Sequence, residues 1–422
     1  MLETLRNAWK VKELRNKILF TILIILIFRI GSVIPVPFVN PEALAASGTS
    51  NDFFNYLSIL TGGGLEYGAI FAMSVTPYIN SSIIVQLLCV AIPALERLSK
   101  EGEEGQKKLA QITRYATVIL ALIQGIAYFI YLKNGAYLSV SKASTFFAGI
   151  VIVLAFTAGS ALVMWLGEQI DAKGVGNGIS ILLFAGILSR GPQAFRILWG
   201  YVKLKQYVSV IGIILAFLVV IAFVVWMTAA ERRIPVQYAK RVVGNKMYGG
   251  QNTHIPIKVN MSGVMPIIFA SSILMLPTMI LGFMSNTETS FAKVLALFSV
   301  QGAFYAIVYF FLIIGFAYFY ATIQFNPVEM ANNLRKNGGA IPGIRPGKPT
   351  TDFISKILSR ITLMGAIFLS AIAILPIVIG SVGGINISLG GTSVLIMVGV
   401  ALDLVRSLES QMMMRHYKGF LD

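Results

Sequence analysis

Long apolar runs alternate with short polar segments along almost the whole chain. Ten runs are long enough to be spans, and they cover residues 18–34, 69–95, 111–132, 146–166, 179–198, 208–230, 261–283, 302–325, 359–380 and 389–411. A helix that crosses a bilayer needs about 20 apolar residues. Backbone groups in hydrocarbon must also bond within their own element. The pattern therefore predicts an all-α polytopic membrane protein with ten transmembrane helices.

A glycine-rich stretch precedes the second run and differs from all the others. Residues 52–66 include Gly62, Gly63 and Gly64 and are too short to cross a bilayer. The run that follows carries polar residues around Ile79 and Ile83, namely Thr76, Asn80, Ser81, Ser82 and Gln86. Polar side chains at that depth usually face protein or water. A short plug-like segment before a helix with one polar face indicates a gated aqueous path.

The N-terminus predicts an interfacial helix over residues 1–16, because Leu2, Leu5 and Trp9 share one side and charged residues occupy the rest. Arg29 lies near the far end of the first span, where it can snorkel. A cleaved signal peptide is the rival reading. The apolar run is too long for one, and the small residues Ala45-Ala46-Ser47 lie far downstream of it.

The distribution of charge sets the orientation. Only 12% of the 422 residues are charged, about half the usual share for a soluble protein, and the net charge is +16. Lysine and arginine gather at both termini and in the loops after the second, sixth and eighth runs, so both termini and the tail at 412–422 are expected in the cytoplasm. The exceptions are Arg190, Arg196, Lys203 and Lys205. They follow the break that Arg190-Gly-Pro192 makes in the fifth run.

The connection that carries these four basic residues divides the ten runs into an N-terminal half, 17–200, and a C-terminal half, 201–411. Two halves with five spans each insert with opposite topology, as in inverted repeats around a central path. Two long basic loops, 231–258 and 326–358, belong to the C-terminal half. One interpretation is that these loops obey the positive-inside rule and have no further role. The other is that they form a surface for RNA or an acidic protein partner, since Tyr238 and Tyr248 are interleaved with the basic residues.

Candidate chemistry is sparse. The single cysteine, Cys89, and the distant His254 and His416 favour neither a disulfide nor a metal site, and we expect no catalytic residue and no cofactor. Residues 174–178 resemble a phosphate loop but follow no predicted strand, so a helix-entry turn is the better interpretation. No acidic residue lies in the middle of a predicted span, although an ion-coupled transporter usually has one there. This weakens the hypothesis that the protein is a secondary transporter. That transporter and a membrane-embedded enzyme remain the alternatives.

Several stretches together resemble the SecY family, the channel subunit of the protein-translocation complex. They are residues 77–88, Trp165-Leu-Gly-Glu-Gln169 with Gly176-Asn-Gly-Ile-Ser180, residues 253–266, Asn326-Pro327 through Gly343-Ile-Arg-Pro-Gly347, and Gly390-Gly-Thr-Ser393. The resemblance covers the whole chain in order. It implies a non-enzymatic channel in a bacterial cytoplasmic membrane, with an hourglass pore between two five-helix halves and a re-entrant plug.

The resemblance also assigns gating residues. It implies an aliphatic pore ring and a plug within about residues 53–67, and the lateral gate lies between the second and seventh helices. The ring is Ile79, Ile83, Leu183, Ile268 and Ile396, with Ile187 as an alternative to Leu183. The plug includes Leu57, Ile59, Leu60, Gly62, Gly63 and Gly64, and the gate includes Asn80, Ser82, Gln86, Ser271 and Ser272. An aliphatic ring offers ions no replacement for their hydration shells.

The resemblance finally implies partners. The basic loops would dock the ribosome and the SecA motor ATPase through Arg232, Arg233, Lys240, Arg241, Lys246, Arg345 and Lys348. Small SecE-type and SecG-type membrane subunits would complete the complex. Signal peptides, secretory polypeptides and membrane lipid would contact the channel itself.

Overall fold

A computed structural model describes residues 9–46, 61–135, 137–139, 144–238, 241–243, 246–248, 252–261, 263–283, 290–298, 302–383 and 391–418. The chain forms two compact units. The first comprises residues 1–211, 274–302 and 396–422, and the second comprises residues 212–273 and 303–395. Each unit is described separately.

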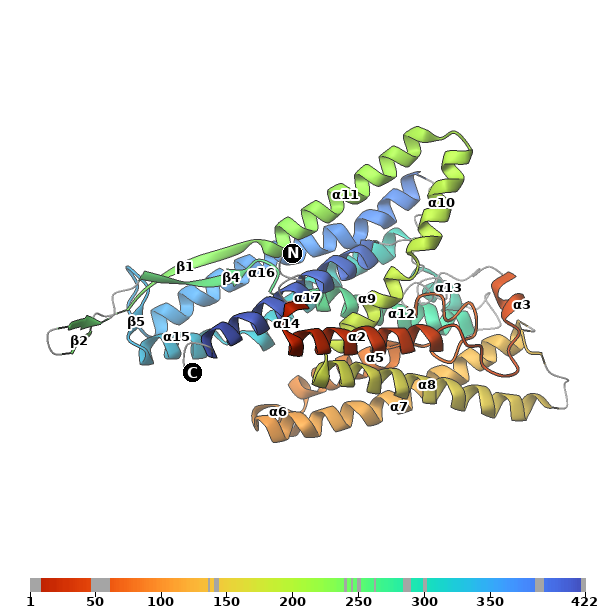
Figure 1. The fold of residues 1–422 in the computed structure, drawn as a ribbon, viewed down its shortest axis with the longest axis horizontal. Coiled ribbons are helices and arrows are strands. Elements are labelled where there is room, and N and C mark those ends of the chain that lie inside the picture. The colour runs from red at the N-terminus through yellow and green to blue at the C-terminus, as the bar shows by residue number, and fades with distance from the viewer. Residues whose placement is uncertain are drawn as a thin grey trace. The chain divides into compact units, whose positions relative to one another are not determined.

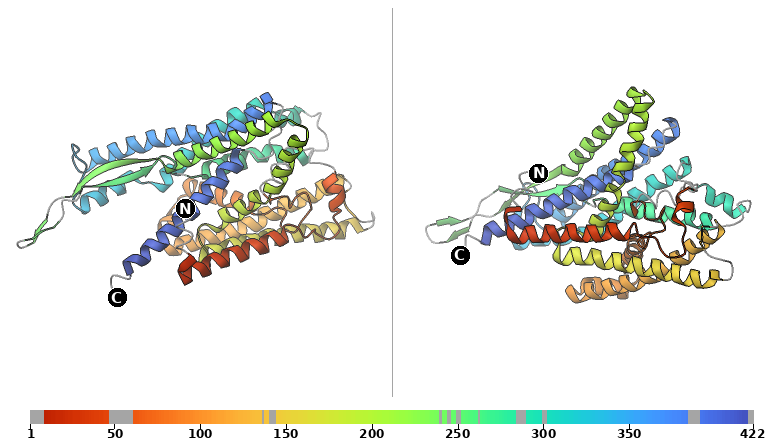
Figure 2. Two further views of the ribbon diagram at one scale, coloured as in Figure 1. Left: turned by 45° about the horizontal axis from the view of Figure 1, so that its top comes forward. Right: turned by 45° about the vertical axis from the view of Figure 1, so that its right-hand side comes forward.

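The first unit is a bundle of helices (Figure 1). Its helices are α2 (Lys12–Gly31), α3 (Pro41–Ala46), α5 (Thr76–Ala91), α6 (Pro93–Lys100), α7 (Glu103–Asn134), α8 (Thr145–Lys173), α9 (Gly178–Leu188), α10 (Gly191–Lys203), α13 (Ser290–Ala296) and most of α17 (Gly391–Lys418). In every view of Figures 1 and 2, α7 and α8 lie side by side. A core of Tyr128, Leu132, Ile152 and Phe156 joins them.

Glycines allow the backbones of other segments to approach α8 closely. The backbone carbonyl of Ile70 passes so near Gly159 of α8 that a Cβ there would overlap it, and Gly178 faces the Gly167 carbonyl in the same way. Membrane helices commonly use glycine at such contacts. The turn before α9 is a helix entry, because the Asn177 side chain accepts a hydrogen bond from the Ser180 amide at 3.0 Å. The interpretation of residues 174–178 as a helix-entry turn is confirmed.

The second unit combines helices with a small sheet. It holds most of α11 (Tyr207–Ala229), the start of α12 (Met265–Phe283), α14 (Ala303–Gln324), α15 (Pro327–Lys336) and α16 (Lys348–Gly383). Its strands are β1 (Glu231–Tyr238), β2 (Arg241–Val243), β3 (Lys246–Tyr248), β4 (Asn252–Lys258) and β5 (Gly339–Ala340). One sheet has the antiparallel order β4-β1-β5, and β2 pairs with β3.

This sheet corrects the all-α prediction for the loop at 231–258. Ile234 and Val236 alternate with exposed residues on β1, so one face of the strand is apolar. That face packs on Leu334 of α15 and Ile354 of α16. The loop at 326–358 likewise holds α15, β5 and the start of α16. The prediction for both loops rests on charge alone and does not use the alternation of apolar and polar residues that marks β1.

The described helices support several spans without confirming ten. Six are long and apolar enough to cross a membrane, or seven if α5 and α6 count as one broken span, bent by 104°. The predicted span at 69–95 was wrong at both ends, since α5 begins at Thr76 and stops at Ala91 before Pro93. Helix α2 begins at Lys12, so it includes the last residues of the predicted interfacial helix at 1–16, which stays a prediction. The break within the fifth run is confirmed: α9 ends at Leu188 and α10 begins at Gly191.

Candidate functional site

Residues 61–75, which we call the 61–75 segment, form a buried run of turns in the first unit, directly before α5. Thr61, Leu65 and Ala69 are at most 3% exposed. Gly62 and Gly68 have φ of +66° and +57°, a backbone conformation that side chains with a Cβ rarely adopt. Of the glycines predicted for the plug, Gly62 and Gly63 have positive φ, and Gly62 makes its turn in a packed environment.

The backbone of this segment pairs with the chain that leaves α2. The Val36 amide donates to the Gly68 carbonyl and the Ile70 amide donates to the Ile34 carbonyl, both at 2.9 Å. The ring of Phe71 stacks on Phe28 with centroids 6.1 Å apart. These hydrogen bonds pair backbone amide and carbonyl groups that would be paired within a helix if the segment were helical. That explains how the segment stays irregular and buried at once.

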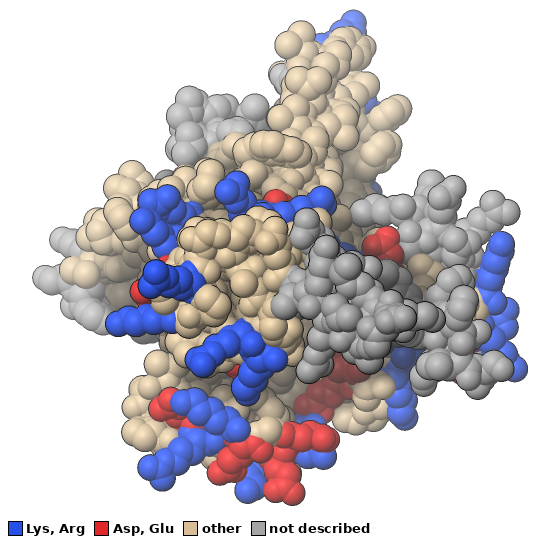
Figure 3. Space-filling view, turned by 90° about the vertical axis from the view of Figure 1, so that its left-hand side faces the viewer, with Lys and Arg blue, Asp and Glu red and all other residues tan. Residues whose placement is uncertain are grey.

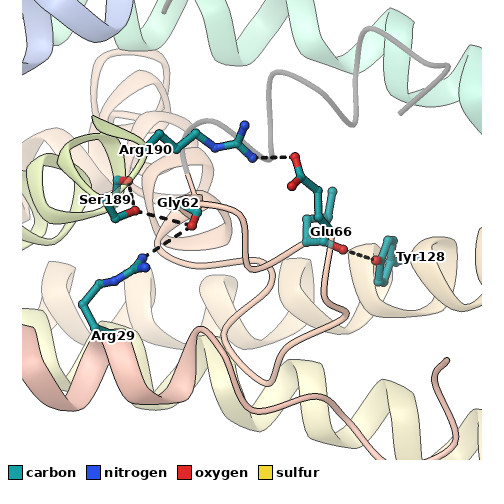
Figure 4. Close-up of polar contacts among 8 residues, drawn as sticks. Arg29, Gly62, Glu66, Tyr128, Ser189 and Arg190 are labelled. Atoms are coloured by element: carbon teal, nitrogen blue, oxygen red, sulfur yellow. Dashed lines mark hydrogen bonds and ion pairs between the residues drawn. The ribbon is translucent and has the colours of Figure 1, made fainter. Parts of the chain in front are cut away.

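Side chains from three other parts of the unit reach the start of the segment (Figure 4). Arg190, just past the end of α9, donates from Nη2 to Glu66 Oε1 at 2.6 Å. The two side chains are only 10% and 26% exposed. Tyr128 of α7, which is 3% exposed, donates its hydroxyl hydrogen to the Leu65 carbonyl at 2.9 Å.

Two longer contacts converge on one carbonyl oxygen, that of Gly62. Arg29 Nη1 on α2 lies 3.5 Å from it, and Ser189 Oγ lies 3.4 Å from it. Ser189 makes a shorter bond to the Gly186 carbonyl at 2.6 Å. We call Arg29, Tyr128, Ser189 and Arg190 the seat. The seat places two arginines and two hydroxyls around residues 62–66.

Sequence reasoning missed most of the seat. From sequence alone, Arg190 is only an exception to the charge distribution, and Arg29 is expected only to extend its side chain toward the membrane surface. Glu66 was not singled out, although it is the one acid beside the glycine run. An acid there and an arginine at a helix break are the available signals, but their separation of 124 residues hides the pairing.

The predicted ring residues lie on the expected helices. Ile83 of α5 and Ile396 of α17 are 3% and 2% exposed, and Ile79 and Ile268 are half-buried. Leu183 and its alternative Ile187 are both buried on α9. Ile268 belongs to the second unit and the other ring residues to the first. The ring stays a prediction.

Three of the five predicted lateral-gate residues take part in hydrogen bonds within their own helices. Gln86 Nε2 donates to Ser82 Oγ at 3.4 Å on α5, and Ser271 Oγ donates to the Ile268 carbonyl at 2.9 Å on α12. Among the described residues, Asn80 Oδ1 is buried without a hydrogen-bond partner. Ser272 is half-buried. Leu57, Ile59 and Leu60 of the predicted plug lie outside the described residues.

The predicted docking residues lie mainly on the second unit's strands and loops. Arg232 and Arg233 are exposed on β1, and Arg233 pairs with Glu231 at 2.7 Å. Arg345 and Lys348 are exposed as well. Arg241 is on β2 and Lys246 on β3, while Lys240 lies outside the described residues. Figure 3 shows a face of the molecule on which lysine and arginine lie at many places, with the largest group of acids toward the bottom of the view.

No metal centre was expected, and the described part of the chain holds no group of three or more His, Cys, Asp or Glu side chains that could ligate an ion.

Similarity to known proteins identifies the family of this chain. A sequence model of the SecY family matches residues 69–405. The chain belongs to the SecY family. Its resemblance to that family is thereby confirmed, and SecY proteins are channel subunits of a translocase rather than enzymes.

Curated SecY relatives match over their full length. The protein translocase subunit SecY of Halalkalibacterium halodurans is 43% identical over 441 residues, and that of Bacillus subtilis is 44% identical over 438 residues. Each alignment covers 100% of both chains. This SecY-family chain is therefore similar to translocase subunits over its whole length.

Solved structures share the SecY fold at lower identity. One described as "The structure of a protein conducting channel" has a TM-score of 0.64 at 17% identity and covers 94% of this chain and 92% of that one. A second, of Sec61 in a canine ribosome-channel complex, has a TM-score of 0.61 at 16% identity, with 94% and 92% covered. A third concerns a SecY plug domain that stabilises the closed channel, with a TM-score of 0.63 at 17% identity and the same coverage.

Proposed function

We propose that this chain is a protein-conducting channel of the bacterial cytoplasmic membrane. It passes unfolded secretory polypeptides across the bilayer and releases transmembrane segments sideways into lipid. The observation that carries the proposal is full-length identity of 43% to translocase subunits named SecY. The apolar helices long enough to span a bilayer agree with it.

Two inverted five-helix halves form the path in this proposal, with both termini in the cytoplasm. Ile79, Ile83, Leu183 or Ile187, Ile268 and Ile396 close it as an aliphatic ring. Such a ring excludes ions when idle and packs around many passing sequences, since its side chains require no fixed hydrogen-bond partner. The segment at 53–67 covers the ring from outside. The buried, multiply bonded start of the 61–75 segment supports a plug whose base is fixed.

The lateral gate opens between α5 and α12. Asn80, Ser82, Gln86, Ser271 and Ser272 line it. The bonds of Ser82, Gln86 and Ser271 inside their own helices do not have to break when the two helices part. Pro277 inside α12 removes one backbone donor and localises bending. Signal peptides and nascent membrane segments enter the lipid by this route.

Partners supply the work, because a channel moves its substrate only down a gradient. The exposed basic residues of β1 and of the stretch at 341–350 suit docking of the ribosome and of the SecA ATPase. A solved neighbour is a Sec61 channel in a ribosome complex, which supports the first of these. SecE-type and SecG-type subunits complete the channel.

The test is reconstitution of the purified complex in sealed vesicles with the motor ATPase and ATP. A protease-protected secretory polypeptide inside the vesicles is the expected result. The rival secondary transporter instead requires saturable, ion-coupled uptake of a small solute by the resting vesicles. Vesicles that accumulate solutes and never protect a polypeptide would overturn the proposal.

A further inference from the structure

We infer that the Arg190–Glu66 ion pair is a positioning contact that holds the base of the plug and sets how readily the channel opens. The inference rests on the proposed function and deepens it. It assigns a gating role to residues that neither the family resemblance nor the ring and gate predictions include.

Glu66 lies near the C-terminal end of the predicted plug at 53–67. Residues 53–60 lead into Thr61, which is fully buried, and Glu66 follows five positions later. Within that interval the chain turns through Gly62 and Gly63, both with positive φ. A segment that swings away from the pore pivots on its first fixed point. The seat contacts at residues 62–66 are such a point.

The contacts differ in strength, and the ion pair is the strongest. Its 2.6 Å separation makes it a charge-assisted hydrogen bond, which is stronger than a neutral one. The Tyr128 bond at 2.9 Å is neutral, and the Arg29 and Ser189 contacts at 3.5 and 3.4 Å are at the limit of hydrogen bonding. Removal of either charge leaves the other poorly solvated, which costs more than loss of an exposed pair.

Arg190 is also well placed to report movement. It lies at the break between α9 and α10, as the residue before the first turn of α10. Ser189 next to it contacts the Gly62 carbonyl, so one short stretch of the fifth run contacts both ends of the 62–66 interval. This accounts for an arginine that the orientation rule leaves unexplained. Displacement of α9 and release of the plug base then occur together.

The experiment measures resting ion leak of the intact complex in sealed vesicles. The variants are Glu66→Gln, Arg190→Gln and the charge-reversed double variant Glu66→Arg with Arg190→Glu. The matched control is Arg196→Gln, which removes an exposed arginine from the same helix, α10. We expect each single variant to raise leak about tenfold, equivalent to about 1.4 kcal/mol, the reversed pair to restore most of the difference, and the control to match the parent.

A second measurement separates gating from folding. Thermal aggregation of the purified complex follows stability, whereas export of a secretory protein with a defective signal follows gating. The single variants should export that protein better than the parent, and the reversed pair should return both export and aggregation temperature toward the parent's values. Single variants that leak ions at the same rate as the parent would overturn the inference. So would variants with lowered stability whose leak, at equal amounts of protein, does not change. If a single variant does not accumulate, Glu66→Asp and Arg190→Lys take its place under the same criteria.

The outcome for the proposed function is separate. Translocation of a normal secretory protein by the parent complex tests the channel itself. A parent that translocates while the variants leak no more than it does refutes only the positioning role. A parent that never translocates refutes the channel.

Discussion

Replacement of Gly62 by alanine should destabilise the first unit and loosen the plug base together. The φ of +66° at this residue costs a side chain with a Cβ about 1–2 kcal/mol. The new Cβ would also lie 2.5 Å from Ser189 Oγ and 2.7 Å from the Gly186 carbonyl oxygen. Serine can rotate, but a backbone oxygen inside α9 cannot move cheaply, and such overpacking costs about 1–3 kcal/mol. The expected total is about 2–5 kcal/mol, the sum of these two contributions.

Gly63→Ala is the matched comparison. Its φ of +91° is also strained, yet the nearest atom to a Cβ there is Arg190 Nη2 at 3.8 Å, an ordinary contact. Gly191→Ala, with no atom within 4 Å and no positive φ, should be close to neutral. Unfolding free energies are measured by titration of the detergent-solubilised complex with denaturing detergent, and ion leak in vesicles is measured beside them. Equal destabilisation by Gly62→Ala and Gly63→Ala would show that the close approach to α9 is absent.

Three further predictions concern the pore, the plug and the docking surface. Asparagine at Ile83 and Ile268 should loosen the seal and let secretory proteins with defective signals through, and unchanged signal discrimination in an export assay would count against the ring. Deletion of residues 58–64 should raise ion leak in vesicles that hold equal amounts of assembled complex; a leak equal to that of the parent would mean that this stretch is no plug. Arg345→Glu should impair motor-driven export far more than membrane insertion of the channel, as measured by pulse-labelled export and by fractionation, and an equal loss of both would indicate misfolding.

The apolar runs predicted the long helices well, because hydrocarbon imposes one requirement on every backbone group it surrounds. α7, α8, α11 and α14 each overlap a predicted run. The same reasoning failed at residues 69–75, which are as apolar as a span but turn instead of coiling. Their backbone groups bond to the chain after α2, as in the Ile70–Ile34 bond, so the requirement is met without a helix. Hydrophobicity alone does not reveal such a partner.

Short-range signals were present for other features that we missed. Pro93 after Ile92 marks the bend between α5 and α6, and the alternation of Ile234 and Val236 marks β1. The seat is different in kind. Glu66 and Arg190 are far apart in sequence, and only the packing of the 61–75 segment against α9 brings them to 2.6 Å. A single sequence carries the charges but not the distance between them.

Site-specific crosslinking to a stalled secretory chain tests the channel most directly. A photoreactive residue is placed at position 79, 268 or, as a control, at the exposed position 119 on α7. The account predicts crosslinks to the translocating polypeptide from positions 79 and 268, and none from position 119. Crosslinks to lipid alone from positions 79 and 268, while the polypeptide is engaged, would contradict it.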